Sequence, residues 1–230
     1  MSAELPPPAL AGTLAVFFDL DGTLIDSAPD LAGAANDLRQ QHGLPPLPYA
    51  ELRPMVGSGA RGMVGKAFGV TPADDAFEGL KDAFLSRYEA RSLQETAPFP
   101  FVPPLLDRLE AAGLPWGIMT NKHARFAVPI VSALGLQARA ATVVCGDTAS
   151  RAKPFPDPLL LCASRLGLDP AQCVYVGDDL RDVQAGRAAG MRTVAVRWGY
   201  LGEGEAIDDW QADHVISHPS ELLALLGLAD

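Results

Sequence analysis

Cysteine, basic residues and long apolar runs are all scarce in this chain of 230 residues. Its three cysteines, Cys145, Cys162 and Cys173, are odd in number and form no CxxC pair, which argues against a disulfide framework or a cysteine-ligated metal. We expect them to be reduced core residues. No apolar stretch approaches the roughly 20 residues that a membrane-spanning helix needs. The sequence therefore predicts a protein without membrane-spanning segments.

Positive charge is in deficit, with 18 basic against 28 acidic residues and a net charge of -10. Nucleic acid and anionic membranes are thereby disfavoured as partners, because both are bound through clustered cations. A small anionic substrate remains compatible, since the local charge of a site can oppose the net charge. The proline-rich start, residues 1–8, has neither a basic nor an apolar signal region, so we expect an extended tail on a cytoplasmic monomer or homodimer.

Two aspartates, by contrast, stand where an apolar run stops. Residues 15–18 predict a buried strand, and Asp19-Leu20-Asp21-Gly22-Thr23 follows it directly. Positions i and i+2 of an extended segment point to the same side, so both carboxylates can converge. Keeping both ionised requires a cation or a shared proton, and a divalent metal is the simplest solution. An ordinary polar turn is the alternative, because Asp-Gly pairs are common in turns.

Strand and helix patterns alternate along most of the chain. Strands are expected at 15–18, 116–120, 141–145, 173–177, 193–196 and 214–216, and helices at 104–112, 124–134, 158–166, 179–189 and 220–226. This alternation predicts an α/β fold with a doubly wound, mainly parallel sheet. Helical stretches at 30–41 and 74–91, with a glycine-rich turn at 56–62 between them, predict an all-helical insert. We place a core at 1–27 and 99–230 and the insert at 28–98.

Polar residues follow the later strands as well. Thr120, Asn121 and Lys122 stand where the strand at 116–120 ends, Lys153 opens a helix, and Asp178, Asp179 and Asp182 follow the strand at 173–177. Each has an ordinary explanation: Thr120, Asp178 and Asp179 as helix caps, Lys153 as a solvated lysine, and Asp182 as a surface partner of Arg181 or Arg187. Ligands of such sheets bind beyond the carboxyl ends of the strands, however. We therefore expect one site at this edge.

These motifs, in this order, resemble the haloacid dehalogenase superfamily. The resemblance implies a Rossmann-like core with a helical cap, Mg²⁺ as cofactor, and phosphoryl transfer through an aspartyl-phosphate. It assigns Asp19 as the nucleophile and Asp21 as the general acid and base. It further implies that Asp19, Asp178 and the Asp21 carbonyl hold the metal, that Thr120, Asn121 and Lys153 bind the phosphate, and that Asp179 and Asp182 orient Lys153 or metal-bound waters.

Within the superfamily the chain is similar to phosphoglycolate phosphatases and to N-acetylmuramic acid 6-phosphate phosphatases. The first similarity lies around Gly57-Ser58-Gly59 and Lys153-Pro154, and the second around Gly59-Ala60-Arg61. The implied activity is Mg²⁺-dependent hydrolysis of a small phosphorylated acid, phosphoglycolate first. Alternatives are the amino-sugar phosphate, a phosphomutase of the β-phosphoglucomutase type, and a non-catalytic binding protein. Arg61 is the expected reader of the substrate carboxylate, with an exposed surface arginine as the alternative.

Overall fold

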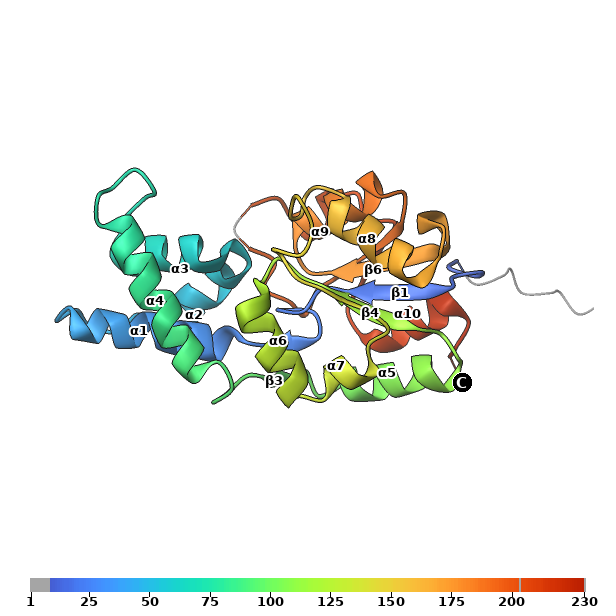
Figure 1. The fold of residues 1–230 in the computed structure, drawn as a ribbon, viewed down its shortest axis with the longest axis horizontal. Coiled ribbons are helices and arrows are strands. Elements are labelled where there is room, and N and C mark those ends of the chain that lie inside the picture. Colours follow the sequence, from blue (N-terminus) through green and yellow to red (C-terminus); the bar gives the residue numbers. More distant parts are fainter. Residues whose placement is uncertain (1–8, 203, 230) are drawn as a thin grey trace, which may run out of the picture.

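A six-stranded parallel sheet forms the centre of the larger part of the molecule (Figure 1). The computed structural model describes residues 9–202 and 204–229, so the expected extended tail at 1–8 lies outside the described residues. The strands are β1 (Ala15–Phe18), β4 (Trp116–Met119), β5 (Val143–Val144), β6 (Cys173–Gly177), β7 (Arg192–Val196) and β8 (His214–Ile216). Their order is β5-β4-β1-β6-β7-β8, and every pair is parallel. The predicted fold class is confirmed.

Helices cover both faces of this sheet (Figure 1). They are α5 (Val102–Ala111), α6 (Ala124–Ala133), α7 (Leu136–Arg139), α8 (Asp157–Leu166), α9 (Leu180–Ala188) and α10 (Pro219–Leu226), with short 3-10 turns η2 (Pro170–Gln172) and η3 (Ile207–Asp209). Side chains of β1 alternate between the two faces: Val16 and Phe18 enter one apolar cluster, Ala15 and Phe17 another. Burial on both faces explains why β1 is apolar at every position.

A second group of helices lies apart from the sheet and is here called the cap (Figure 1). It comprises α1 (Ala28–Gln41), α2 (Tyr49–Leu52), the 3-10 helix η1 (Arg53–Ser58), α3 (Gly59–Phe68) and α4 (Phe77–Arg91). The chain enters the cap through β2 (Ile25–Asp26) and leaves it through β3 (Ala97–Pro98), which pair antiparallel. Both connections to the core therefore lie side by side, close to the end of β1.

The glycine-rich segment at 56–62 differs from the expected turn. It belongs to η1 and α3, which follow each other without a loop. Gly59 has a φ of 62°, and this left-handed conformation redirects the chain between the two helices without the steric penalty that a side chain would bring. Arg61 consequently lies in the first turn of α3.

The three cysteines are free and buried, as predicted. Among residues 9–202 and 204–229, the structure contains no helix with the length and apolar character that crossing a membrane requires.

Candidate active site

A buried lysine joins two carboxylates at the carboxyl edge of the sheet. Lys153 Nζ lies 2.8 Å from Asp19 Oδ1, at the end of β1, and 2.6 Å from Asp182 Oδ1, in the first turn of α9. Only 4% of the Lys153 side chain is exposed, which rules out a solvated surface lysine. Asp182 is equally buried and faces Lys153 rather than a surface arginine. A lysine held between two acids keeps its charge in spite of its burial.

Further contacts fix the position of this lysine. Its ammonium group donates to the Tyr175 hydroxyl at 3.0 Å, and Asp182 Oδ2 accepts from the Asp179 backbone N–H at 3.0 Å. Gly177 allows the Asp182 side chain to pack directly against the end of β6, because a Cβ at position 177 would lie 2.3 Å from Asp182 Cγ. Tyr175 is central to this network, and sequence reasoning missed it because its position within β6 marks only a core residue.

Asp178 completes a cluster of buried carboxylates. It accepts from Thr23 Oγ1 at 2.9 Å and from the Tyr200 backbone N–H at 2.8 Å. One oxygen each of Asp19, Asp178 and Asp182 lies within 4.8 Å of the others. The chain also wraps Asp178 closely, since a Cβ added to Gly22 would meet its Oδ2 at 2.2 Å. Such a concentration of oxygen ligands is typical of a site for a hard cation.

The charge balance of this cluster is unfavourable without a further cation. Burial raises the pKa of Asp19 to about 7, with Asp182 and Asp21 adding to the rise and Lys153 opposing it. Burial, followed by the charges of Asp19 and Asp182, raises the pKa of Asp178 well above its ordinary value. A divalent cation would supply the missing positive charge, so the residues fit a Mg²⁺ site.

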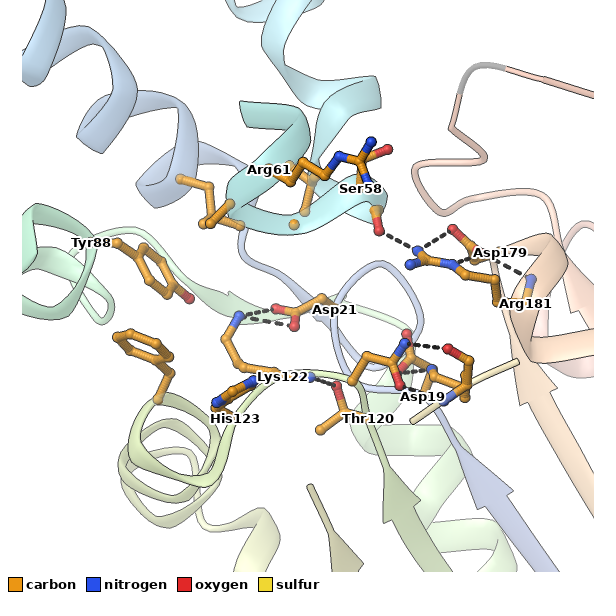
Figure 2. A pocket seen from close by; sticks show the side chains of 18 of the residues that line it. Asp19, Asp21, Ser58, Arg61, Tyr88, Thr120, Lys122, His123, Asp179 and Arg181 are labelled. Atoms are coloured by element: carbon orange, nitrogen blue, oxygen red, sulfur yellow. Dashed lines mark hydrogen bonds and ion pairs between the residues drawn. The ribbon is translucent and has the colours of Figure 1, made fainter. Parts of the chain in front are cut away.

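Asp21 has partners different from those of Asp19. Its two oxygens lie 2.7 and 2.9 Å from Lys122 Nζ, and Ser27 Oγ donates to Oδ1 at 2.5 Å (Figure 2). Burial opposes the charge of Lys122, but the interactions with Asp21 and Tyr88 together outweigh it and raise the lysine pKa. The sequence places Lys122 among the candidate residues at this strand end, but the resemblance gives it no specific role.

Thr120 and Asn121 lie beside the same edge. Thr120 Oγ1 accepts from the Lys122 N–H at 3.1 Å, while the N-cap of α6 is His123, so Thr120 does not cap that helix. Asn121 donates from Nδ2 to the Lys153 carbonyl at 3.1 Å and accepts from the Lys153 N–H at 2.9 Å. The Asn121 side chain thus couples the loop after β4 to the loop that carries Lys153.

The core and the cap touch through two arginines. Asp179 caps α9 and pairs with Arg181 at 2.7 Å, and Arg181 in turn donates to the Gly57 carbonyl of the cap (Figure 2). Arg181 lowers the pKa of Asp179 although burial opposes this. From the cap, Arg53 donates to the Gly199 carbonyl of the core at 3.0 Å. These contacts hold η1 over the carboxyl edge of the sheet.

A cavity of about 680 Å³ opens between the two parts. Asp19, Asp21, Thr120, Lys122 and Lys153 line its core side, and Val56, Arg61, Phe84 and Tyr88 its cap side. Arg61 is exposed and lies beside Ser58 on the cap wall, across the cavity from Asp21 (Figure 2). The cavity therefore combines anion-binding groups with an aromatic wall above the carboxylates.

Comparison with known proteins agrees with this geometry. Residues 16–196 match the model of the haloacid dehalogenase-like hydrolases. The chain belongs to this family. It is 45% identical over 215 residues to an N-acetylmuramic acid 6-phosphate phosphatase of Pseudomonas aeruginosa, covering 94% of this chain and 95% of the relative. It is 48% identical over 209 residues to a phosphoglycolate phosphatase of Xanthomonas campestris, covering 90% and 94%.

Solved structures lead to the same family. The crystal structure of a predicted phosphoglycolate phosphatase from Haemophilus somnus matches with a TM-score of 0.81 at 27% identity, covering 92% of this chain and 97% of that one. As a haloacid dehalogenase-like phosphatase, the protein is a phosphoric monoester hydrolase that acts on small phosphorylated substrates. A phosphoric monoester hydrolase is therefore favoured over the two alternatives that the sequence left open, a phosphomutase and a non-catalytic binding protein.

Proposed function

We propose that the protein is a Mg²⁺-dependent phosphatase of small phosphorylated acids, with phosphoglycolate as the first candidate substrate. The observation that carries the proposal is the buried contact between Asp19 and Lys153, beside Asp178 and open to the cavity. A nucleophilic carboxylate next to a fixed cation suits attack on a phosphate ester, because the cation offsets the repulsion between two anions.

The metal would be held by side-chain oxygens of Asp19 and Asp178 and by the backbone carbonyl of Asp21. When bound, Mg²⁺ supplies positive charge for the oxygens of the transferring phosphoryl group. Asp182, whose oxygens already accept from Lys153 and from the Asp179 N–H, is assigned to positioning Lys153.

In the first step, an oxygen of Asp19 attacks phosphorus, and the bond between phosphorus and the ester oxygen breaks. Asp21 gives its proton to the departing alcohol. Lys153, the Thr120 hydroxyl and the Asn121 backbone N–H interact with the phosphoryl oxygens. The product of this step is an aspartyl-phosphate on Asp19.

In the second step, Asp21 takes a proton from water, and the water oxygen attacks phosphorus. The bond between phosphorus and Asp19 breaks, inorganic phosphate leaves, and the nucleophile returns as a carboxylate. The same residue therefore acts as acid first and as base second, which requires it to lie on the leaving-group side of phosphorus. The cap would exclude bulk water from the first transfer.

A larger acid is the second candidate, and the volume of the cavity favours it. Cavities of about 300–1,000 Å³ normally enclose ligands of drug size, and 680 Å³ far exceeds what phosphoglycolate fills. N-acetylmuramic acid 6-phosphate would also place its sugar against the aromatic wall formed by Phe84 and Tyr88.

Metal dependence and substrate class can be tested together. The purified protein should hydrolyse phosphoglycolate or N-acetylmuramic acid 6-phosphate with Mg²⁺, lose this activity in EDTA, and recover it when Mg²⁺ is restored in excess. Asp178→Ala should raise the Mg²⁺ concentration required for half-maximal rate at least tenfold, because one carboxylate ligand is lost. Full activity in chelator would contradict the metal assignment, and failure on every phosphorylated acid would contradict the proposed substrate class.

A further inference from the structure

Tyr88 on α4 carries a buried hydroxyl whose O–H finds no acceptor among the described residues. The residue is 2% exposed, and within the described part of the chain its oxygen makes no hydrogen bond of normal geometry. Tyr88 lines the cavity, and its hydroxyl is directed towards Lys122 and Asp21 (Figure 2). Its ring packs on Phe126 at 5.7 Å between centroids, which fixes this direction. A buried hydroxyl left unsatisfied is costly, so a partner from outside the chain is indicated.

Lys122 offers a second donor at the same place. Its ammonium group has three N–H donors, which face the two oxygens of Asp21 at 2.7 and 2.9 Å and the Tyr88 hydroxyl beside them. Its Nζ lies 4.9 Å from the centre of the Tyr88 ring, and only 9% of its side chain is exposed. A phenolic donor and a cation thus adjoin Asp21 on the leaving-group side of the proposed reaction.

We propose that Tyr88 and Lys122 together bind a carboxylate oxygen of the leaving alcohol, close to its ester oxygen. The inference rests on the proposed function, because Asp21 defines where the ester oxygen lies. Two donors, one of them cationic, select an anionic acceptor over a neutral one. Tyr88 is then a specificity-determining residue for phosphate esters of short 2-hydroxy acids.

The position of this subsite separates short acids from long ones. In a 2-phosphorylated hydroxy acid, one carbon atom separates the carboxylate from the ester oxygen, so only cations beside Asp21 can reach it. Arg61 lies across the cavity (Figure 2) and is available to an acid whose carboxylate is remote from the phosphate. Recognition of a short acid should therefore depend on Tyr88 and be independent of Arg61.

A matched pair of substrates tests the subsite. Phosphoglycolate and ethyl phosphate differ only by the carboxylate, and the measured quantity is the ratio of their kcat/KM values. Tyr88→Phe keeps the ring and removes the hydroxyl, so this ratio should fall about tenfold. Tyr49→Phe is the control, because Tyr49 is 43% exposed and lies outside the cavity lining. It should leave the ratio at the wild-type value.

Thermal stability provides a second readout. Because the O–H has no acceptor among the described residues, Tyr88→Phe should keep or raise the melting temperature while the ratio falls. A merely structural hydroxyl would instead lower the melting temperature and leave the ratio unchanged. That result would overturn the proposal, and so would equal kcat/KM values of the wild type for phosphoglycolate and ethyl phosphate. A wild type inactive on phosphoglycolate, ethyl phosphate and p-nitrophenyl phosphate would refute the proposed function itself.

Discussion

At the scale of single residues, Asp19 and Asp21 differ in the lysine that each of them contacts. Asp19 pairs with Lys153, which Asp182 anchors in turn, whereas Asp21 pairs with Lys122. A spacing of two residues predicted that both carboxylates would face one edge. Their distinct partners place the two carboxylates in separate environments, which is a requirement for giving them separate roles.

Asp21→Asn should separate substrates by their leaving groups. Without a proton donor, the first step should slow strongly for phosphoglycolate and much less for p-nitrophenyl phosphate, whose leaving group needs little protonation. Rapid-mixing kinetics should show a burst of nitrophenol followed by slow turnover, since the second step lacks its base. An equal loss of the first step for both substrates would contradict the acid role of Asp21.

Arg61→Ala should weaken recognition of an acid remote from the phosphate. We expect the ratio of kcat/KM for N-acetylmuramic acid 6-phosphate to that for N-acetylglucosamine 6-phosphate, which lacks the acid, to fall about ten- to a hundredfold. The loss of a charge-assisted contact is the physical reason. An unchanged ratio would mean that Arg61 is only an exposed surface residue. Equal losses of kcat/KM for both sugar phosphates would mean that Arg61 binds the phosphate or supports the cap instead.

At the scale of elements, a buried acid ties the first cap helix to the segment that leaves the cap. Asp30 on α1 is fully buried and accepts from the Thr96 N–H and hydroxyl, both at 2.8 Å. It also lies 3.6 Å from Arg91 Nε, and the same arginine pairs at 2.6 Å with Asp37, whose side chain is 54% exposed. The two carboxylates share an arginine but differ in burial.

Asp30→Ala should therefore lower the free energy of unfolding by about 3 kcal/mol or more, because it leaves the buried donors of Thr96 unsatisfied and removes the buried partner of Arg91. Asp37→Ala is the matched control and should cost less than about 1 kcal/mol, as exposed ion pairs do. Urea denaturation of both variants measures the difference. Equal losses would mean that burial does not determine the strength of these pairs.

The strands and helices of the core were largely predictable, and the contacts between core and cap were not. Residues 15–18 and 173–177 are short apolar runs stopped by polar residues, so local sequence determines where these strands end. The helix α5 begins at Val102 rather than at the expected Pro104, because proline in a first helical turn loses no hydrogen bond. The contacts of Lys122 with Tyr88, and of Arg181 with Gly57, join segments distant in sequence, and no local pattern reports them.

At the scale of the whole molecule, a chain of net charge -10 encloses a cavity bordered by cations. The cavity is lined by Arg61, Lys81, Lys122, Arg125, Lys153 and Arg181, from cap and core alike. Five aspartates line the cavity as well, so cations outnumber acids there by one, although acids dominate the chain as a whole. In the proposed function, the core supplies the reacting carboxylates, and the cap adds the far wall that distinguishes one leaving group from another.

Trapping the covalent intermediate is the most direct test of this account. The proposal requires a phosphoryl group on Asp19, and Asp21→Asn should let it accumulate because hydrolysis lacks its base. Intact-protein mass spectrometry after mixing this variant with p-nitrophenyl phosphate and Mg²⁺ should show one added phosphoryl group, located by peptide mapping on Asp19. The double variant with Asp19→Asn should show no adduct and no turnover. An adduct on another residue, or sustained turnover by Asp19→Asn alone, would contradict the account.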